Sequence, residues 1–223
     1  MTEPPRLVLA SNSPRRRELL ALTNLTFRVT HAQVDESRLP GEQPADYVLR
    51  LACAKAYSSA GEASDNELIL AADTTVVDGE ALLGKPREDA EARMMLTALR
   101  GHSHHVCTGL ALLQVRDKRL VTDLCVTTVP MRAYSDDEIF RYVATGDPLD
   151  KAGAYGIQHP EFQPVENLNG CYTSVMGLPL CHLTRSLYRL GVELIADVAG
   201  NCQSKLGYSC PISRAVLDGL QVG

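Results

Sequence analysis

The sequence has no tryptophan and only three phenylalanines among its 223 residues, and it contains no long apolar run. A helix needs about 20 apolar residues to cross a bilayer, so we expect neither a membrane protein nor a membrane partner. The N-terminal segment MTEPPRLVLASNSP begins with an acid and two prolines, and its apolar stretch is too short for a secretory signal. These absences favour a cytoplasmic protein.

Positive charge is not in excess either. The chain has 22 basic and 27 acidic residues, a net charge of −5 and an isoelectric point near 5.7. Because binding to DNA or RNA rests on clustered Lys and Arg, we do not expect a nucleic acid polymer as a partner. This balance still permits a small anionic substrate that is held by a local group of cations.

The usual disulfide and zinc patterns are also missing. The seven cysteines are an odd number and include no CxxC pair, which favours reduced thiols over a disulfide framework. Cys202 and Cys210, with Cys181 and His182 upstream, are the strongest candidates for a zinc site. Their spacing matches no common zinc motif, so we favour ordinary thiols.

The sequence does contain the pattern of an α/β protein. Hydrophobic residues make up 45% of the chain and charged residues 22%, as in ordinary soluble domains. Strand and helix patterns interleave without a strict β-α-β rhythm, which predicts an α/β fold with a mixed sheet. The expected strands are 6–10, 67–73, 103–115 and 119–132, and the expected helices are 14–22, 44 onward, 87–100, 135–146 and 177–192.

Turn signals and composition complete the outline. Asp78-Gly79 and Asn169-Gly170 each predict a hairpin. Residues 1–195 are expected to form the main domain. Residues 196–223, which are rich in Gly, Ser and Cys, are expected to form an appended tail of unassigned role.

The first candidate site segment joins a strand to a helix. Ser11 and Ser13 lie in a polar turn, Ser13 suits the helix N-cap, and Arg15 and Arg16 follow in the first turn. Free backbone N–H groups and the helix dipole at such a point suit a phosphate. Arginines there oppose the dipole unless an anion neutralises them. A phosphate site and a solvated basic turn both remain open.

The second candidate is Asp73, at the end of the buried strand 67–73. A carboxylate at the carboxyl end of a strand lies where open α/β sheets bind ligands, and it can hold a divalent metal or take a proton from water. An Asp that only caps a turn is the alternative. Downstream, Lys85 supplies a cation in a rigid Gly-Lys-Pro turn.

The third candidate is the loop 146–158, GDPLDKAGAYGIQ. Its glycines let the backbone approach a ligand closely, and Lys151 can meet anionic oxygens. An ordinary Gly-rich loop is the alternative interpretation.

Further motifs join these segments along residues 6 to about 192. They are LASNSPRRRELL (9–20), VDE (34–36), RLACAKA (50–56), AADTTVV (71–77), LGKPRE (83–88), HHVCTG (104–109), GDPLDKAGAYGIQ (146–158) and GCYTSVMGLPL (170–180). In type and order they resemble the Maf family of nucleoside triphosphate pyrophosphatases. The resemblance does not extend to residues 196–223.

This resemblance implies a fold and a reaction. The family has an elongated mixed sheet with flanking helices and two lobes around a cleft, similar to the inosine triphosphate pyrophosphatase fold. It hydrolyses a nucleoside triphosphate between the α and β phosphates and needs a divalent cation such as Mg²⁺, with Mn²⁺ as an alternative. Similar proteins are often dimers, so a homodimer is the oligomeric state to be tested.

The resemblance also implies roles for single residues. Asp73 matches the catalytic proton acceptor, and Glu36 together with Asp73 matches the acids near the metal. Fixed cations and a metal can stabilise the charge that develops on the leaving pyrophosphate, while the Asp deprotonates water. The residues expected around the triphosphate are Ser11, Ser13, Arg16, Lys55, Lys85 and Lys151.

Three positions bear on the choice of substrate. Arg15, Thr74 and Gln158 match the branch that acts on dTTP and UTP, including modified uridine triphosphates; the 7-methyl-GTP branch typically has Trp, Gln and Glu there. A neutral amide such as that of Gln158 both donates and accepts, which suits a pyrimidine edge. The alternatives are 7-methyl-GTP or another modified nucleotide, a nucleotide-binding regulator of cell division, and a phosphate-binding scaffold without turnover.

Overall fold

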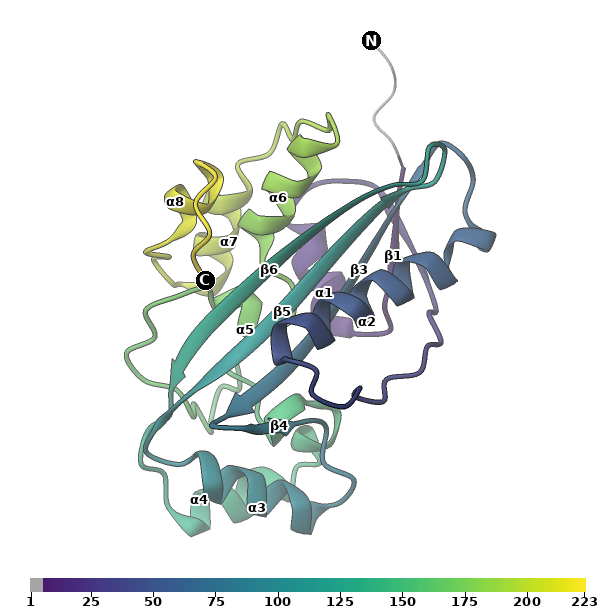
Figure 1. Ribbon diagram of the computed structural model, residues 1–223. Coiled ribbons are helices and arrows are strands. Elements are labelled where there is room, and N and C mark those ends of the chain that lie inside the picture. Colours follow the sequence, from purple (N-terminus) through teal and green to yellow (C-terminus); the bar gives the residue numbers. More distant parts are fainter. Residues whose placement is uncertain (1–5) are drawn as a thin grey trace.

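A six-stranded mixed sheet organises the protein, whose computed structural model describes residues 6–223 (Figure 1). The strands run in the order β2-β1-β3-β5-β6, with β4 beside β3. β1 pairs in parallel with β2 and β3, and the other pairs are antiparallel. The strand bounds are Arg6–Ala10 (β1), Phe27–Thr30 (β2), Glu67–Asp78 (β3), Ala81–Leu83 (β4), Ser103–Gln114 (β5) and Arg119–Pro130 (β6). The predicted α/β class with a mixed sheet is confirmed.

Helices flank both faces and one end of the sheet (Figure 1). α2 (Pro44–Ser58) packs on β3 and β5, and α6 (Leu180–Arg189) packs on β5 and β6. α3 (Asp89–Leu99) and α4 (Asp136–Val143) pack on each other near β4. The other helices are α1 (Pro14–Ala21), α5 (Tyr172–Val175), α7 (Val198–Leu206), α8 (Ser213–Leu217) and the 3-10 turns η1 (Ala60–Glu62), η2 (Asp147–Asp150) and η3 (Ala152–Ala154).

Within residues 6–223, no helix is long and apolar enough to span a membrane. Residues 1–5, which include the acid and two of the prolines of the N-terminal segment, lie outside the described residues.

Both faces of the central strand β3 are buried. On one face, Ile69 packs with Ala52 and Ala56 of α2. On the other face, Leu68 and Leu70 join the larger core, which includes residues of α3, α4 and α6. Burial on both sides explains why β3 begins with a continuous apolar run instead of an alternating pattern.

The packing of α2 on the sheet depends on Gly109 in β5. A Cβ atom at this position would lie 2.8 Å from the backbone carbon and oxygen of Val48 in α2. Gly109 is also the cross-strand partner of Asp73 in β3. The missing side chain therefore lets α2 come close to the sheet beside Asp73.

Several local predictions are confirmed. The Ser13 side chain caps α1 by accepting a hydrogen bond from the backbone N–H of Arg16. At the start of the predicted helix 135–146, Ser135 and Glu138 form a capping box. The β3–β4 hairpin turns directly after Asp78. Each of these features is specified by neighbouring residues in the sequence.

Two element predictions are wrong. β3 does not end at Asp73 but continues to Asp78, because residues 74–77 are all β-branched and pair with β5. Asn169-Gly170 does not form a hairpin, because the chain passes into α5 and Gly170 packs closely against Thr127 of β6. In both places a tertiary partner overrides the local signal.

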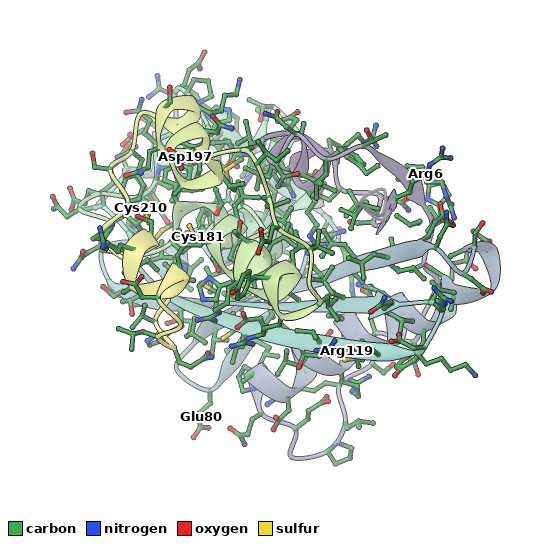
Figure 2. The ribbon with its side chains drawn as sticks, turned by 90° about the horizontal axis from the view of Figure 1, so that it is seen from above. Arg6, Glu80, Arg119, Cys181, Asp197 and Cys210 are labelled. Carbon is green, nitrogen blue, oxygen red and sulfur yellow. The ribbon has the colours of Figure 1, made fainter. Side chains whose placement is uncertain are left out.

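The C-terminal residues 196–223 form α7 and α8, which pack against α6. Figure 2 shows this region from above and labels Asp197, which precedes α7, Cys210, which follows it, and Cys181 of α6. Val198 and Val216 are buried. Arg185 of α6 donates hydrogen bonds to the backbone oxygens of Val216 and Leu220. The segment is thus folded, and the predicted domain boundary at residue 195 stays a prediction.

Arg185 also forms a buried ion pair with Asp123 at 2.6 Å, with side chains 5% and 1% exposed. We expect Arg185→Ala to lower the free energy of unfolding by about 3 kcal/mol, because it removes the two short charge-assisted hydrogen bonds of buried Asp123 and leaves only the more distant Arg189 as its cationic partner. Urea denaturation measures this change. The control Arg214→Ala removes an exposed pair with Asp218 and should cost less than about 0.5 kcal/mol. Equal losses in both variants would contradict the prediction.

Candidate functional site

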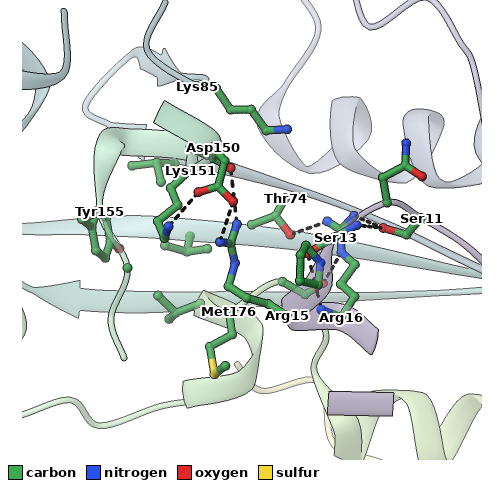
Figure 3. A pocket seen from close by; sticks show the side chains of 18 of the residues that line it. Ser11, Ser13, Arg15, Arg16, Thr74, Lys85, Asp150, Lys151, Tyr155 and Met176 are labelled. Carbon is green, nitrogen blue, oxygen red and sulfur yellow. Dashed lines mark hydrogen bonds and ion pairs between the residues drawn. The ribbon is translucent and has the colours of Figure 1, made fainter. Parts of the chain in front are cut away.

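A cavity of about 350 Å³ opens where β1 ends, α1 begins and the loop 147–158 packs over β3 (Figure 3). Its walls come from segments that are far apart in the sequence. The predicted site residues that line it are Ser11, Ser13, Arg15, Arg16, Glu36, Lys55, Thr74, Lys85, Lys151 and Gln158. Asp73 is 8% exposed and adjoins the cavity through its ion pair with Lys55. The structure thus brings every predicted site residue to one place.

Arg16 extends from the first turn of α1 into the cavity wall. Its guanidinium donates from Nε to Gly177 O at 2.8 Å, from Nη1 to Ser11 Oγ at 3.2 Å and from Nη2 to Thr74 Oγ1 at 3.2 Å. All three acceptors are neutral, and burial lowers the pKa of Arg16. A desolvated cation with neutral partners is strongly stabilised by an anion, so this position suits a phosphate.

Two residues that the sequence analysis missed complete the surroundings of Arg16. Gly177 has φ +104°, and a Cβ there would lie 3.3 Å from both Arg16 Nε and Thr74 Oγ1. Thr108 contacts Thr74 Oγ1 at 2.9 Å and donates to Ser174 O at 2.9 Å. Both residues lie inside quoted motifs, but only the folded chain shows that they face Arg16.

Lys55 of α2 joins two carboxylates from different segments. Its Nζ lies 2.6 Å from Asp73 Oδ1 in β3 and 2.6 Å from Glu36 Oε1 in the loop after β2. The side chains of Lys55 and Asp73 are 12% exposed, whereas that of Glu36 is 60% exposed. Lys55 therefore lies between a buried acid and an accessible one.

The two acids differ in how easily they ionise. Burial raises the pKa of Asp73 above its usual range, although the charges of Lys55 and Arg16 oppose this shift. Burial also acts to raise the pKa of Glu36, but the hydrogen bond and charge of Lys55 outweigh it, so the net shift is downward. A pair of carboxyl groups with separated pKa values is typical of sites that transfer protons.

Lys151 lines the cavity from the loop 147–158, and carboxylates of the same loop already neutralise its charge. Its Nζ donates to Asp147 O, Asp147 Oδ1 and Asp150 Oδ1, each at 2.7 Å. Arg15 Nη1 lies 3.1 Å from the other carboxylate oxygen of Asp150 (Figure 3). Asp147 and Asp150, which the sequence analysis did not assign to the site, thus hold two of the predicted cations. Their position next to Lys151 in the loop was the signal that could have indicated this.

Lys85 enters the cavity from a different wall than Arg15 and Arg16 (Figure 3). It follows β4, and the neighbouring Gly84 O accepts a hydrogen bond from Gly153 N at 3.0 Å. Among residues 6–223, Lys85 forms no ion pair. Lys85 and Arg16 are therefore the cavity cations whose charges have no carboxylate partner within the described part of the chain.

Neither the acidic side chains nor the cysteines form a ready-made metal site in the described part of the chain. Within the described range 6–223, no three His, Cys, Asp or Glu side chains are arranged to hold a metal ion. His182 uses its Nε2 for the backbone oxygen of Val222. A metal at Glu36 and Asp73 would consequently need further ligands from water or a bound phosphate.

Comparison with known proteins defines the class of this protein. The family model described as "Maf-like protein" matches residues 6–190. The chain therefore belongs to the Maf family. The match ends before α7 and α8, so the C-terminal segment lies outside it.

Curated relatives cover most of the chain and carry one name. A "dTTP/UTP pyrophosphatase" from Geobacter sulfurreducens is 44% identical over 85% of this chain and 98% of its own. Proteins of the same name from Photorhabdus laumondii and Clostridium botulinum are 48% and 42% identical, over 78% and 84% of this chain and 88% and 98% of theirs. Among solved structures, the Staphylococcus aureus Ham1 protein matches with a TM-score of 0.41 and 16% identity, over 56% of this chain and 71% of its own.

The unpaired charge of Lys85 leads to a binding prediction. We expect Lys85→Ala to weaken binding of inorganic tripolyphosphate by about tenfold, because it removes a charge-assisted contact in a partly desolvated cavity. Isothermal titration calorimetry measures the dissociation constant. Lys205→Ala, at an exposed position of α7, serves as the matched control. The same affinity in both variants would show that Lys85 does not contact the anion.

Proposed function

We propose that this protein hydrolyses dTTP and UTP, including modified uridine triphosphates, to the nucleoside monophosphate and pyrophosphate. The observation that carries the proposal is the proximity of a buried acid, Asp73, to a cavity where Arg16 and Lys85 have no carboxylate partner among residues 6–223. Relatives at 42–48% identity that are named dTTP/UTP pyrophosphatase support it.

Asp73 is the proposed proton acceptor. Its raised pKa makes the carboxylate a stronger base than an exposed Asp, and the contact with Lys55 holds it ionised and oriented. The carboxylate takes a proton from water as the water oxygen bonds to phosphorus. The bond between the bridging oxygen and the attacked phosphorus breaks, and pyrophosphate leaves with the electron pair.

The cations neutralise the charge that grows on the leaving group. Arg16 is held by three neutral acceptors, so its orientation is set before an anion binds. Lys85 approaches from another wall, which allows the two charges to contact different phosphates. Donors that are already in place stabilise such charge without reorganisation at the moment of reaction.

The acids suit a divalent cation. Mg²⁺ usually binds through one or two carboxylates together with waters and substrate phosphates, and Glu36 and Asp73 supply two carboxylates on either side of Lys55. When bound, Mg²⁺ or Mn²⁺ would neutralise phosphate charge and lower the pKa of a bound water. Glu36 is the more accessible ligand of the two, and its lowered pKa keeps it ionised.

The pyrimidine preference rests on three side chains. Gln158 lines the cavity near Gly156 and Lys151, where its amide can both donate and accept. Thr74 is committed to Arg16 and Thr108, and Arg15 is committed to Asp150. We therefore assign direct contact with the base to Gln158 and an indirect contribution to Thr74 and Arg15. A cytoplasmic location and a homodimer stay predictions.

A panel of triphosphates with Mg²⁺ tests the proposal, with pyrophosphate release as the measurement. We expect dTTP and UTP to exceed 7-methyl-GTP, and Asp73→Asn to lower kcat by about a hundredfold or more because the proton acceptor is lost. Asp78→Asn, in the same strand, is the control and should keep nearly full activity. Preference for 7-methyl-GTP would give the alternative substrate class.

Two further outcomes of this panel separate the remaining alternatives. Absence of turnover with every triphosphate would indicate a binding scaffold. A cellular effect on division that survives in Asp73→Asn would indicate a regulator instead of an enzyme.

Substitution of Gln158 tests the specificity assignment. Gln158→Glu removes the amide donor and adds a negative charge, so we expect the ratio of kcat/KM for dTTP to that for 7-methyl-GTP to fall by about tenfold. Gln114→Glu, at the far end of β5, makes the same chemical change away from the cavity. A fall in activity with an unchanged substrate ratio would assign Gln158 to the triphosphate instead of the base.

A further inference from the structure

We propose that Tyr208, in the C-terminal segment outside the family match, is a positioning residue for the candidate site. It fixes the chain segment 168–177, which forms the wall against which Arg16 rests. The activity readout of this inference rests on the proposed function, whereas its binding readout does not.

The segment 168–177 holds Arg16 through its backbone. Gly177 O accepts the 2.8 Å hydrogen bond from Arg16 Nε, and Ser174 O accepts from Thr108, which in turn contacts Thr74. Val175, Met176 and Gly177 also line the cavity. Any displacement of this segment therefore moves the acceptor that orients the Arg16 guanidinium.

Tyr208 contacts the beginning of the same segment. Its Oη lies 2.9 Å from Gly170 O and 3.2 Å from Leu168 O, and it accepts a hydrogen bond from Gly170 N at 3.3 Å. Its ring packs on Tyr172, with 5.5 Å between the ring centroids. The phenol oxygen thus contacts backbone groups of Leu168 and Gly170 just before α5, accepting from Gly170 N and donating its single proton to one of the two carbonyl oxygens.

α7, which precedes Tyr208, also contacts α1, the helix that carries Arg16. In α7, Asn201 donates from Nδ2 to Leu22 O at 3.1 Å, at the end of α1. α1 carries Arg16 in its first turn, so α7 contacts α1 through Asn201 while Tyr208, directly after α7, contacts the wall. The C-terminal segment therefore contacts both α1 and the segment 168–177, which the Arg16–Gly177 hydrogen bond joins.

Tyr208→Phe tests this role because it removes the hydroxyl and keeps the ring. We expect the dissociation constant for inorganic tripolyphosphate and the KM for dTTP to rise about fivefold, the effect of one lost hydrogen bond, with kcat nearly unchanged. Tyr188→Phe makes the same change at an exposed position of α6 and should alter neither value. A lower kcat with an unchanged KM for dTTP and an unchanged affinity for tripolyphosphate would show that the Tyr208 hydroxyl only supports folding.

A double-mutant cycle shows whether the effect passes through Arg16. In an Arg16→Ala background, Tyr208→Phe should have no further effect on tripolyphosphate affinity, because the group that it positions is gone. An equal effect in both backgrounds, or none in either, overturns the proposal. If the wild-type protein binds tripolyphosphate but hydrolyses no triphosphate, the proposed function fails while the binding cycle still decides the role of Tyr208.

Discussion

The contacts of the Lys55 ammonium group with Asp73 and Glu36 hold the candidate site together. Asp73 lies in the middle of a buried strand, where an isolated carboxylate is costly. Lys55 supplies the opposite charge, and it reaches Asp73 because Gly109 lets α2 lie close to the sheet. The close approach of Gly109 to the backbone of α2 thus contributes to the electrostatics of the site.

The cations around the cavity fall into two groups. Lys55, Lys151 and Arg15 are paired with carboxylates of the protein, whereas Arg16 and Lys85 have none among residues 6–223. Lys55 connects α2 with β3 and with the loop after β2, Arg15 connects α1 with the loop 147–158, and Lys151 pairs within that loop. We propose that Arg16 and Lys85 supply the affinity for anions. This division explains how an acidic chain with a net charge of −5 can select a polyanion.

Local sequence signals predicted much of this arrangement. The Ser13 cap identified the strand-to-helix turn, and the family motifs identified the residues that line the cavity. The same signals could not show that β3 continues beyond Asp73, because that extension depends on pairing with β5. Nor could they show that Asp150 holds Arg15, a contact across 135 residues. The motifs could not identify Tyr208, because it lies outside the residues that the family model matches.

The position of Asp150 makes ligand entry an exchange of counter-ions. Its carboxylate is 57% exposed and lies between Arg15 and Lys151, so a phosphate that approaches these cations must compete with it. Part of the Coulomb attraction is cancelled by separating the existing pairs, and affinity is weaker than the number of basic residues suggests. The Asp150 carboxylate would also return to Arg15 and Lys151 when a charged product leaves this part of the cavity.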